Sequence, residues 1–266
     1  MSQRREIEAR LALYDDLSGI LGAMRSFALA ELHRVTRCAA AQLEVVQTLL
    51  AALHDLAPAL SEPVKDTADI WLLFGSVRGF CGSFNEDVVR TWRAAGAPTP
   101  TVVVGERLAG GLGENGGHIE VAGALGALDA VAAIDRILAA LDVGRQQLPA
   151  ASGLMVCFRD DSGARCERLL PLPPGKDVSA VVLPLTLEPA AHLAEKVVEH
   201  YLFHALLSRL LCAIRVENHM RLTQMENALQ HIGRSSEELQ RQRNRLRQEE
   251  IVEEIELIVQ ERRGLG

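Results

Sequence analysis

The sequence predicts an α/β protein with long helices, in which an antiparallel coiled coil of N- and C-terminal helices carries an inserted small Rossmann-like α/β domain. All ten prolines lie between Pro58 and Pro189, and the residues outside this interval hold only five of the 21 glycines. Proline and glycine interrupt regular structure, so both ends can form long helices. Apolar residues recur at helical spacing in both ends, and short apolar runs alternate with helical segments between them. We therefore expect three parts: residues 1–57, 58–189 and 190–266.

The N-terminal part has one apolar helical face. Its residues are three and four positions apart, which places them on one side of a helix. They are Ile7, Leu11, Tyr14, Leu17, Leu21, Met24, Ala28, Leu32 and Val35, followed less regularly by Leu43, Val46, Leu49 and Leu53. A continuous helix from Glu6 to Leu56 would be roughly 75 Å long.

The C-terminal part repeats this pattern over a greater length. Its stripe is Leu193, Val197, Tyr201, His204, Leu207, Leu211, Ile214, Asn218, Leu222, Met225, Leu229 and Ile232. Helices of this length are typical of coiled coils, and neither can bury its stripe alone. Because a whole domain connects the two helices, we expect them to pair antiparallel. Gly233 is the interior position at which we expect a bend.

The last stretch is charged and has two interpretations. Four arginines precede five glutamates: Arg241, Arg243, Arg245 and Arg247, then Glu249, Glu250, Glu253, Glu254 and Glu256. They could form a solvated helix with i,i+4 ion pairs, each worth only about 0.2–0.5 kcal/mol. Alternatively, the helix extends past its coiled-coil partner into a cavity of another protein.

The middle part has the pattern of parallel βαβ units. Short apolar runs predict buried strands, and segments with helical spacing lie between them. The expected strands are Asp69–Phe74, Thr101–Val104 and Leu154–Phe158, and the expected helices are Asn85–Ala95 and Leu125–Leu141. After a turn at residues 160–163, Glu167–Leu170 could return as an antiparallel strand, and Val178–Leu183 could add a last one.

Residues 111–116 match the G-x-G-x-x-G pattern of nucleotide-binding loops. That chemistry requires a strand that ends at the first glycine and a helix that begins at the last. Here the strand ends near Gly105, and residues 117–121 have an extended pattern, so a flexible loop is favoured. Gly175-Lys176 lacks the other residues of a P-loop and is expected to form a turn.

No combination of residues predicts catalysis, a cofactor or a metal. His200 and His204 share a helical face, but Tyr201 stands where a metalloprotease has its glutamate, which favours packing roles. Ser76, Cys81 and Ser83 are conceivable nucleophiles without a recognisable base. The adjacent aspartates 15–16 and 160–161 have no feature of an acid–base couple.

Charge and cysteine content exclude further classes. With 28 basic and 35 acidic residues, the formal charge is −7, which argues against nucleic-acid binding. The five cysteines are scattered without a C-x-x-C pair, which favours reduced thiols. The charged N-terminus does not resemble a signal peptide, and the most apolar run, residues 205–214, is too short to span a membrane. At a membrane, the protein would be peripheral.

Three function classes remain: a mechanical or interaction protein built on a coiled coil, a nucleotide-binding α/β enzyme with helical arms, and a free-standing coiled-coil adaptor. Binding of NAD or ATP would favour the enzyme, and a stable monomer or dimer without further partners would favour the adaptor.

Three segments resemble the gamma subunit of F-type ATP synthases, the central rotor shaft. Residues 5–24, from Arg-Glu-Ile to Gly-Ala-Met, resemble the family's first helix. Residues 75–85, Gly-Ser-Val-Arg-Gly-Phe-Cys-Gly-Ser-Phe-Asn, are similar to its Ser-Asp-Arg-Gly-Leu-Cys-Gly-Gly-Phe-Asn. Residues 244–259, from Asn-Arg-Leu-Arg-Gln to Ile-Val, resemble its Asn-x-x-Arg-Gln-x-x-Ile-Thr-x-Glu-Ile-x-Glu-Ile-Val. Departures at Val77, Val252, Leu257 and Gln260-Glu261 indicate a divergent branch, such as a second-type ATPase.

The resemblance implies a non-catalytic rotor, present in one copy per complex. Its coiled coil would stand inside a ring of three alpha and three beta subunits, and its α/β domain would contact the epsilon subunit and the membrane c-ring. Catalysis would occur on the beta subunits, at the cytoplasmic face of a bacterial inner membrane, with no cofactor bound here. The implied beta-subunit contacts are Arg247, Gln248, Met24, Arg25 and Glu254, and the implied structural motif comprises Arg78, Gly79, Cys81, Gly82 and Asn85.

Overall fold

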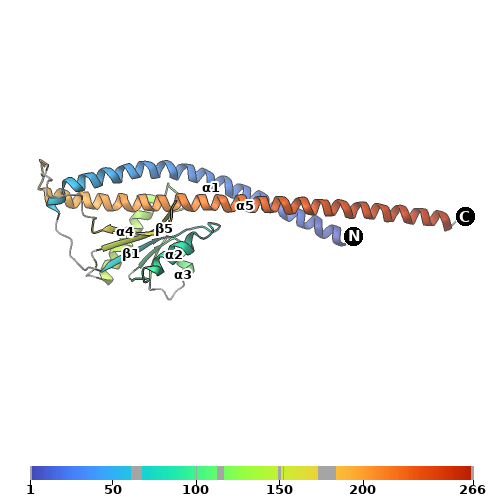
Figure 1. Ribbon diagram of the computed structural model, residues 1–266, viewed down its shortest axis with the longest axis horizontal. Helices are drawn as coiled ribbons and strands as arrows, with labels where there is room; N and C mark the ends of the chain where they lie inside the picture. The colour runs from blue at the N-terminus through green and yellow to red at the C-terminus, as the bar shows by residue number, and fades with distance from the viewer. Residues whose placement is uncertain are drawn as a thin grey trace. The chain divides into compact units, whose positions relative to one another are not determined.

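The computed structural model describes residues 2–60, 68–99, 101–112, 117–148, 151, 153–172 and 184–264. Along the chain, two long helices, α1 (Ser2–Asp55) and α5 (Ala190–Gly264), precede and follow an α/β region (Figure 1). The chain divides into two compact units. The terminal unit comprises residues 1–27 and 222–266, and the central unit comprises residues 28–221. The strand expected at Val178–Leu183 lies outside the described residues.

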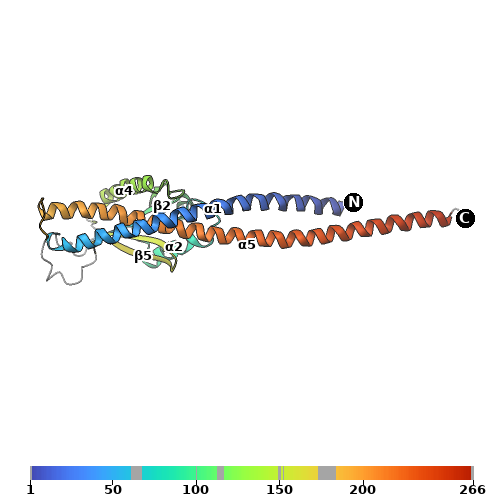
Figure 2. The ribbon, with the colours of Figure 1, turned by 90° about the horizontal axis from the view of Figure 1, so that it is seen from above.

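In the terminal unit, α1 and α5 run side by side in opposite directions (Figures 1 and 2). Arg4 pairs with Glu250 at 3.0 Å, and Arg25 pairs with Glu226 at 3.2 Å. The partner on α5 thus moves toward lower numbers as α1 advances, so the helices are antiparallel as predicted. Helix α5 is continuous through Gly233, where we expected a bend.

The central unit contains one five-stranded sheet in the order β3-β2-β1-β4-β5. Its strands are β1 (Asp69–Phe74), β2 (Thr101–Val104), β3 (Ile119–Val121), β4 (Gly153–Asp160) and β5 (Gly163–Leu170). Strands β1 to β4 are parallel, whereas β5 pairs antiparallel with β4. The βαβ prediction is confirmed, and β1 and β2 have the predicted bounds.

The helices of the sheet domain are α2 (Phe84–Ala94), α3 (Glu106–Leu112) and α4 (Ala130–Gln147). Helix α4 begins five residues later than the predicted Leu125, for a local reason. The Asp129 carboxylate accepts hydrogen bonds from the backbone N–H groups of Leu125 and Gly126, at 2.8 and 3.0 Å, and holds this segment in a turn. Helix α3 was not expected.

The sheet separates two apolar cores. On one face, α2 and α3 cover the outer core, which contains Trp71, Trp92 and Leu108. On the other face, α4 and the adjoining parts of α1 and α5 form the larger inner core, with Phe74, Ile134 and Leu206 fully buried. Both faces of the parallel strands are therefore buried, which explains their continuous apolar sequences.

The loops after β1 and β2 meet closely at the carboxyl edge of the sheet. Gly105 has a φ of +103°, and a Cβ atom there would lie 2.7 Å from the carbonyl oxygen of Gly75. Glycine is needed at position 105 for both its backbone conformation and this close approach. The junction fixes the start of the loop over residues 75–85.

Candidate partner-contact site

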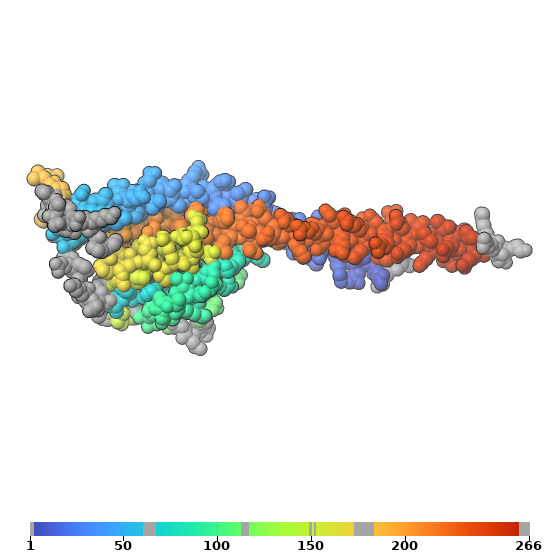
Figure 3. Space-filling model, viewed as in Figure 1, coloured from blue at the N-terminus to red at the C-terminus, as the bar shows by residue number. Residues whose placement is uncertain are grey.

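The end of α5 that follows its last ion pair with α1 is exposed to solvent. We call residues 251–260 the C-terminal segment. Among the described side chains, Glu250 is the last on α5 that pairs with a residue of α1, and all ten residues of the segment are exposed (Figure 3).

The C-terminal segment has many large apolar side chains, each 45–62% exposed. They are Ile251, Val252, Ile255, Leu257, Ile258 and Val259. Ile251, Ile255 and Ile258 are spaced i, i+4, i+7, so they share one helical face. A continuous apolar stripe of this kind marks a surface that contacts another macromolecule.

The predicted contact residues Arg247, Gln248 and Glu254 are all exposed on α5 of the terminal unit. None of them has a hydrogen bond or ion pair with another described residue. Among the four arginines of this region, Arg241 lies 3.9 Å from Glu237, and both side chains are more than 70% exposed. Such a pair contributes little, so ion pairs give this stretch little support of its own.

The other predicted contacts, Met24 and Arg25, lie on α1 of the terminal unit. Met24 is half-buried and Arg25 is exposed. The Arg25 guanidinium pairs with Glu226 of α5, with the two side chains 48% and 46% exposed. Arg25 is thus engaged within the chain, unlike Arg247.

Residues 75–85 form a closed loop in the central unit, held by its own side chains. The Ser76 N–H donates to Asn85 Oδ1 at 2.9 Å, and Asn85 Nδ2 donates to Ser76 Oγ at 2.8 Å. The Cys81 thiol also donates to Ser76 Oγ, at 3.4 Å. Burial raises the pKa of the Cys81 thiol, which makes it a poor nucleophile. These contacts give Cys81 and Asn85 a structural role within the loop.

A polar cluster on α5 clamps this loop. Arg221 Nε donates to the carbonyl oxygen of Gly79 at 3.1 Å, and Nη2 donates to that of Arg78 at 3.3 Å. Arg221 also donates to Asn218 Oδ1 at 3.0 Å and forms an ion pair with Glu217. Glu217, Asn218 and Arg221 are each 5% exposed. The loop is therefore attached to α5 by the guanidinium of Arg221, all three nitrogen atoms of which donate hydrogen bonds.

Two opposing effects act on the pKa of Glu217. Burial raises the pKa of its carboxyl group, whereas the charge and hydrogen bonds of Arg221 and the backbone N–H of Arg78 lower it. Sequence reasoning missed this cluster, because Asn218 was counted within the apolar stripe. The available signal was three polar residues at i, i+1 and i+4 on an otherwise apolar helix.

The clamped loop contains a strained aromatic residue. Phe80 has a φ of 61°, and its side chain is 65% exposed. A bulky residue in this region of backbone space is unusual and costs free energy, which the surrounding hydrogen bonds must offset. Gly82, with a φ of 58°, adopts the same region without that cost.

The carboxyl edge of the sheet does not have the form of a nucleotide site. In doubly wound sheets, ligands bind where the strand order reverses, which here is between β1 and β4. At this edge Arg221 of α5 bonds the loop after β1, and Arg215 pairs with Asp161 after β4 at 2.6 Å. Gly111 lies inside α3, and residues 113–116 of the G-x-G-x-x-G match lie outside the described residues. Among the described residues, Gly111 follows a helical turn and not the end of a strand, as a nucleotide-binding loop would require.

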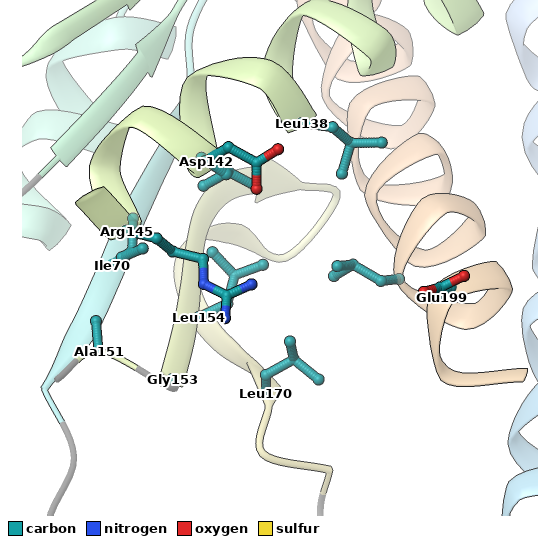
Figure 4. Close-up of a pocket in the computed structure, with 11 residues that line it drawn as sticks. Ile70, Leu138, Asp142, Arg145, Ala151, Gly153, Leu154, Leu170 and Glu199 are labelled. Carbon is teal, nitrogen blue, oxygen red and sulfur yellow. The ribbon is translucent and has the colours of Figure 1, made fainter. Parts of the chain in front are cut away.

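A cavity of about 520 Å³ lies at the opposite edge of the sheet, between α4, α5 and the starts of β1 and β4 (Figure 4). Five of its eleven lining residues are leucines. Asp142, Arg145 and Glu199 are its charged lining residues, and all three are exposed. Arg145 extends over the apolar floor in the close-up. None of these groups is paired in the manner of a catalytic acid and base.

The two histidines do not converge on a metal site. The Gln42 amide lies 2.6 Å from His204 Nδ1 and also donates to the His204 carbonyl oxygen at 3.1 Å. Burial and the nearby His200 lower the pKa of His204. Within the described residues, no group of three or more His, Cys, Asp or Glu side chains could hold a metal ion.

The cysteines differ from the expectation of five reduced thiols. Cys157 and Cys166 form a disulfide between β4 and β5, whereas Cys38, Cys81 and Cys212 are free. The sequence could not reveal this pair, because the nine-residue separation brings the two side chains together only in this strand register.

One described helix is long and apolar enough to cross a membrane by composition alone. It is α5, in which an 18-residue stretch reaches a mean hydropathy of 1.3. Half of that stretch is buried inside the structure, as in a helix that packs in a protein core.

Comparison with models of protein families shows to which family the chain belongs. The ATP synthase family model matches residues 3–260. This chain belongs to the gamma-subunit family of F-type ATP synthases. The resemblance noted in three segments is thereby confirmed over nearly the whole chain, and it identifies a central-stalk subunit, which is a peripheral part of a membrane complex.

Solved structures share the gamma-family fold at low sequence identity. A chain of the Euglena gracilis mitochondrial ATP synthase (OSCP/F1/c-ring, rotational state 3) is 16% identical, with a TM-score of 0.63, and the match covers 97% of this chain and 93% of that one. A chain of the Euglena gracilis rotor is 15% identical, with a TM-score of 0.58 and coverages of 94% and 99%. A chain of the Tetrahymena thermophila central stalk and c-ring is 17% identical, with a TM-score of 0.55 and coverages of 79% and 99%. No curated protein sequence gives a significant match.

Proposed function

We propose that this chain is the rotor shaft of an F-type ATP synthase, turning inside a ring of three alpha and three beta subunits and coupling ion flow through the membrane ring to ATP synthesis or hydrolysis. The observation that carries the proposal is the C-terminal segment, a bare helix with a continuous apolar stripe. An isolated helical end is marginally stable in water, so a partner must cover it. The inside of a protein ring would do so.

Within this proposal, the exposed polar residues next to the stripe contact the beta subunits. Arg247 has no partner among the residues that the structure describes, so its guanidinium is free to bind a carboxylate with two parallel hydrogen bonds. Gln248 and Glu254 lie on the same exposed stretch of α5. Met24 and Arg25 belong to a second contact on α1, and Arg25 would have to exchange Glu226 for a group on beta.

The remaining parts follow from the same assignment. Residues 58–189 form the foot, which contacts the epsilon subunit and the c-ring, while residues 1–57 and 190–266 form the shaft. One copy serves each complex, peripheral to the cytoplasmic face of a bacterial inner membrane. The complex has its catalytic sites on beta. The rotor biases each site by binding one beta conformation better than another.

Co-purification with alpha and beta subunits tests the proposal. We expect one copy of this chain per three beta subunits, and ATPase activity that depends on it. The double variant Ile255→Asp/Ile258→Asp places two charges on the apolar stripe and should prevent assembly. Leu187→Asp is the control, since Leu187 is an exposed apolar residue that lies before α5. The proposal is contradicted if the wild-type chain does not co-purify with the alpha–beta ring and the ATPase activity of the ring does not depend on it.

The contact residues need a separate test. Arg247→Ala should assemble normally but reduce ATP synthesis in the reconstituted complex. Arg241→Ala removes another exposed arginine from the same helix and should leave synthesis unchanged. Equal synthesis by both variants would exclude Arg247 as a beta contact.

A further inference from the structure

The two bonded cysteines occupy facing positions on neighbouring strands. Cys157 of β4 is the register partner of Cys166 of β5, and their Cα atoms are 4.1 Å apart. The other three cysteines have no such neighbour: Cys38 is exposed, Cys81 bonds Ser76, and Cys212 lies on α5. All five cysteines lie in the described part of the chain, and among them only this pair is placed for bond formation.

The two sulfur atoms differ in their access to solvent. The Cys157 side chain is fully buried in the outer core beneath α2, with Trp71 and Trp92 in the same cluster. Cys166 packs against that cluster but is only half-buried. A small reagent in solution therefore reaches Cys166 first, and Cys157 is the second, protected partner.

The strands joined by this bond also hold α5. Glu167, next to Cys166, accepts hydrogen bonds from Arg209 of α5 through both carboxylate oxygens, at 3.0 and 2.6 Å. Asp161, in the turn between the strands, pairs with Arg215 of α5 at 2.6 Å. A change in the rigidity of the β4–β5 hairpin acts directly on its attachment to α5.

We propose that Cys157 and Cys166 form a reversible oxidation site, closed by a peroxide and opened by a small dithiol, which sets the rigidity of the hairpin that holds α5. This property is independent of assembly into an ATP synthase.

The chemistry balances with these two reagents. The Cys166 thiolate attacks one oxygen of hydrogen peroxide, whose O–O bond breaks to give a sulfenic acid and one water after protonation. Cys157 then attacks the Cys166 sulfur, forming the S–S bond and releasing a second water. In the opening direction, a dithiol attacks Cys166, the more accessible sulfur, and leaves as its own disulfide while both protein thiols are regained.

Thiol counting on the full chain tests the site. Chain reduced and purified without oxygen should carry five cysteines that can be alkylated after unfolding in denaturant. Treatment of the folded chain with hydrogen peroxide should remove two of them, which dithiothreitol should restore. Cys157→Ser should abolish disulfide formation within the monomer, whereas Cys38→Ser should not change it. The proposal fails if peroxide leaves all five thiols alkylatable, or if the bond that forms depends on Cys38.

Hydrogen exchange tests the consequence for the hairpin. Amide groups of β5 should exchange about tenfold more slowly in the oxidised chain than in the reduced one, because opening of the hairpin is restricted. Cys157→Ser should exchange at the faster rate under both conditions. Equal β5 exchange in the oxidised and reduced wild type would refute the effect on rigidity, even if the disulfide forms.

Discussion

Removal of the Arg221 side chain should destabilise the central unit more than any single surface change. Arg221→Ala deletes the guanidinium that neutralises Glu217 and that hydrogen-bonds two carbonyl groups of the loop. Both side chains of the ion pair are less than 10% exposed, so Glu217 would remain buried without a cation. The expected loss is about 3–5 kcal/mol. This is a large share of the roughly 5–15 kcal/mol that stabilises a typical domain.

The chain provides its own probe for this measurement. Trp71 and Trp92 are its two tryptophans, and both lie in the outer core of the central unit. Urea unfolding followed by tryptophan fluorescence thus reports on the central unit, whereas circular dichroism is dominated by the long helices. The midpoint should fall by an amount equal to the free-energy loss divided by the slope of the transition.

Two comparisons distinguish loss of the ion pair from simple loss of packing. In Arg221→Ala, burial raises the pKa of Glu217 further above that of the unfolded chain, because Arg78 is then left to oppose it without Arg221. A raised pKa in the folded state favours folding at low pH, so the deficit of the variant should shrink as the pH falls and grow as it rises.

The second comparison is Glu217→Gln/Arg221→Met, which removes both charges and should recover most of the lost stability. A loss below about 1 kcal/mol in Arg221→Ala, or an equal loss in the double variant, would refute the reasoning.

Three further changes are predicted for the central unit with the same unfolding assay. Asn85→Ala leaves the buried Ser76 N–H without its acceptor and should cost about 2–3 kcal/mol, whereas Asn85→Asp keeps that acceptor and should cost less. Phe80→Asn should raise stability by about 1 kcal/mol, because asparagine tolerates a positive φ and the exposed ring packs little; a loss of stability would show that the ring packs after all. In the oxidised chain, Cys157→Ser should cost about 2.5 kcal/mol, as expected for a closed loop of this nine-residue separation, and reductant should have a similar effect on the wild type but none on the variant.

The elements predicted correctly from the sequence are those whose pattern depends on burial alone. Strands β1 and β2 are buried on both faces, so their apolar runs begin and end with the strands themselves. Helix α3 was missed because Gly110 and Gly111 give it low intrinsic propensity. It forms because Leu108 and Ala109 pack into the outer core, which is a tertiary effect.

The candidate site was predictable where it depends on a local sequence pattern, and not where it depends on contacts between distant segments. The exposed position of Arg247 follows from the charge pattern of the last helix. By contrast, the Arg221 clamp and the cysteine pair depend on contacts between segments distant in sequence, or on an exact strand register. Arg221 lies 142 positions from Gly79, whose carbonyl oxygen it bonds, and no local pattern in the sequence indicates this contact.

The antiparallel pairing of α1 and α5 also has a consequence for biosynthesis. Gln42 and His204 are 162 positions apart in the chain, and Arg4 and Glu250 are 246 apart. At translation rates of about 5–20 residues per second, the apolar face of α1 waits roughly 10–50 s for its partner to be made. During that interval the β-sheet can form, but the first helix remains uncovered on the ribosome. A transient binder of that helix would therefore influence the yield of folded chain without any role in the finished complex.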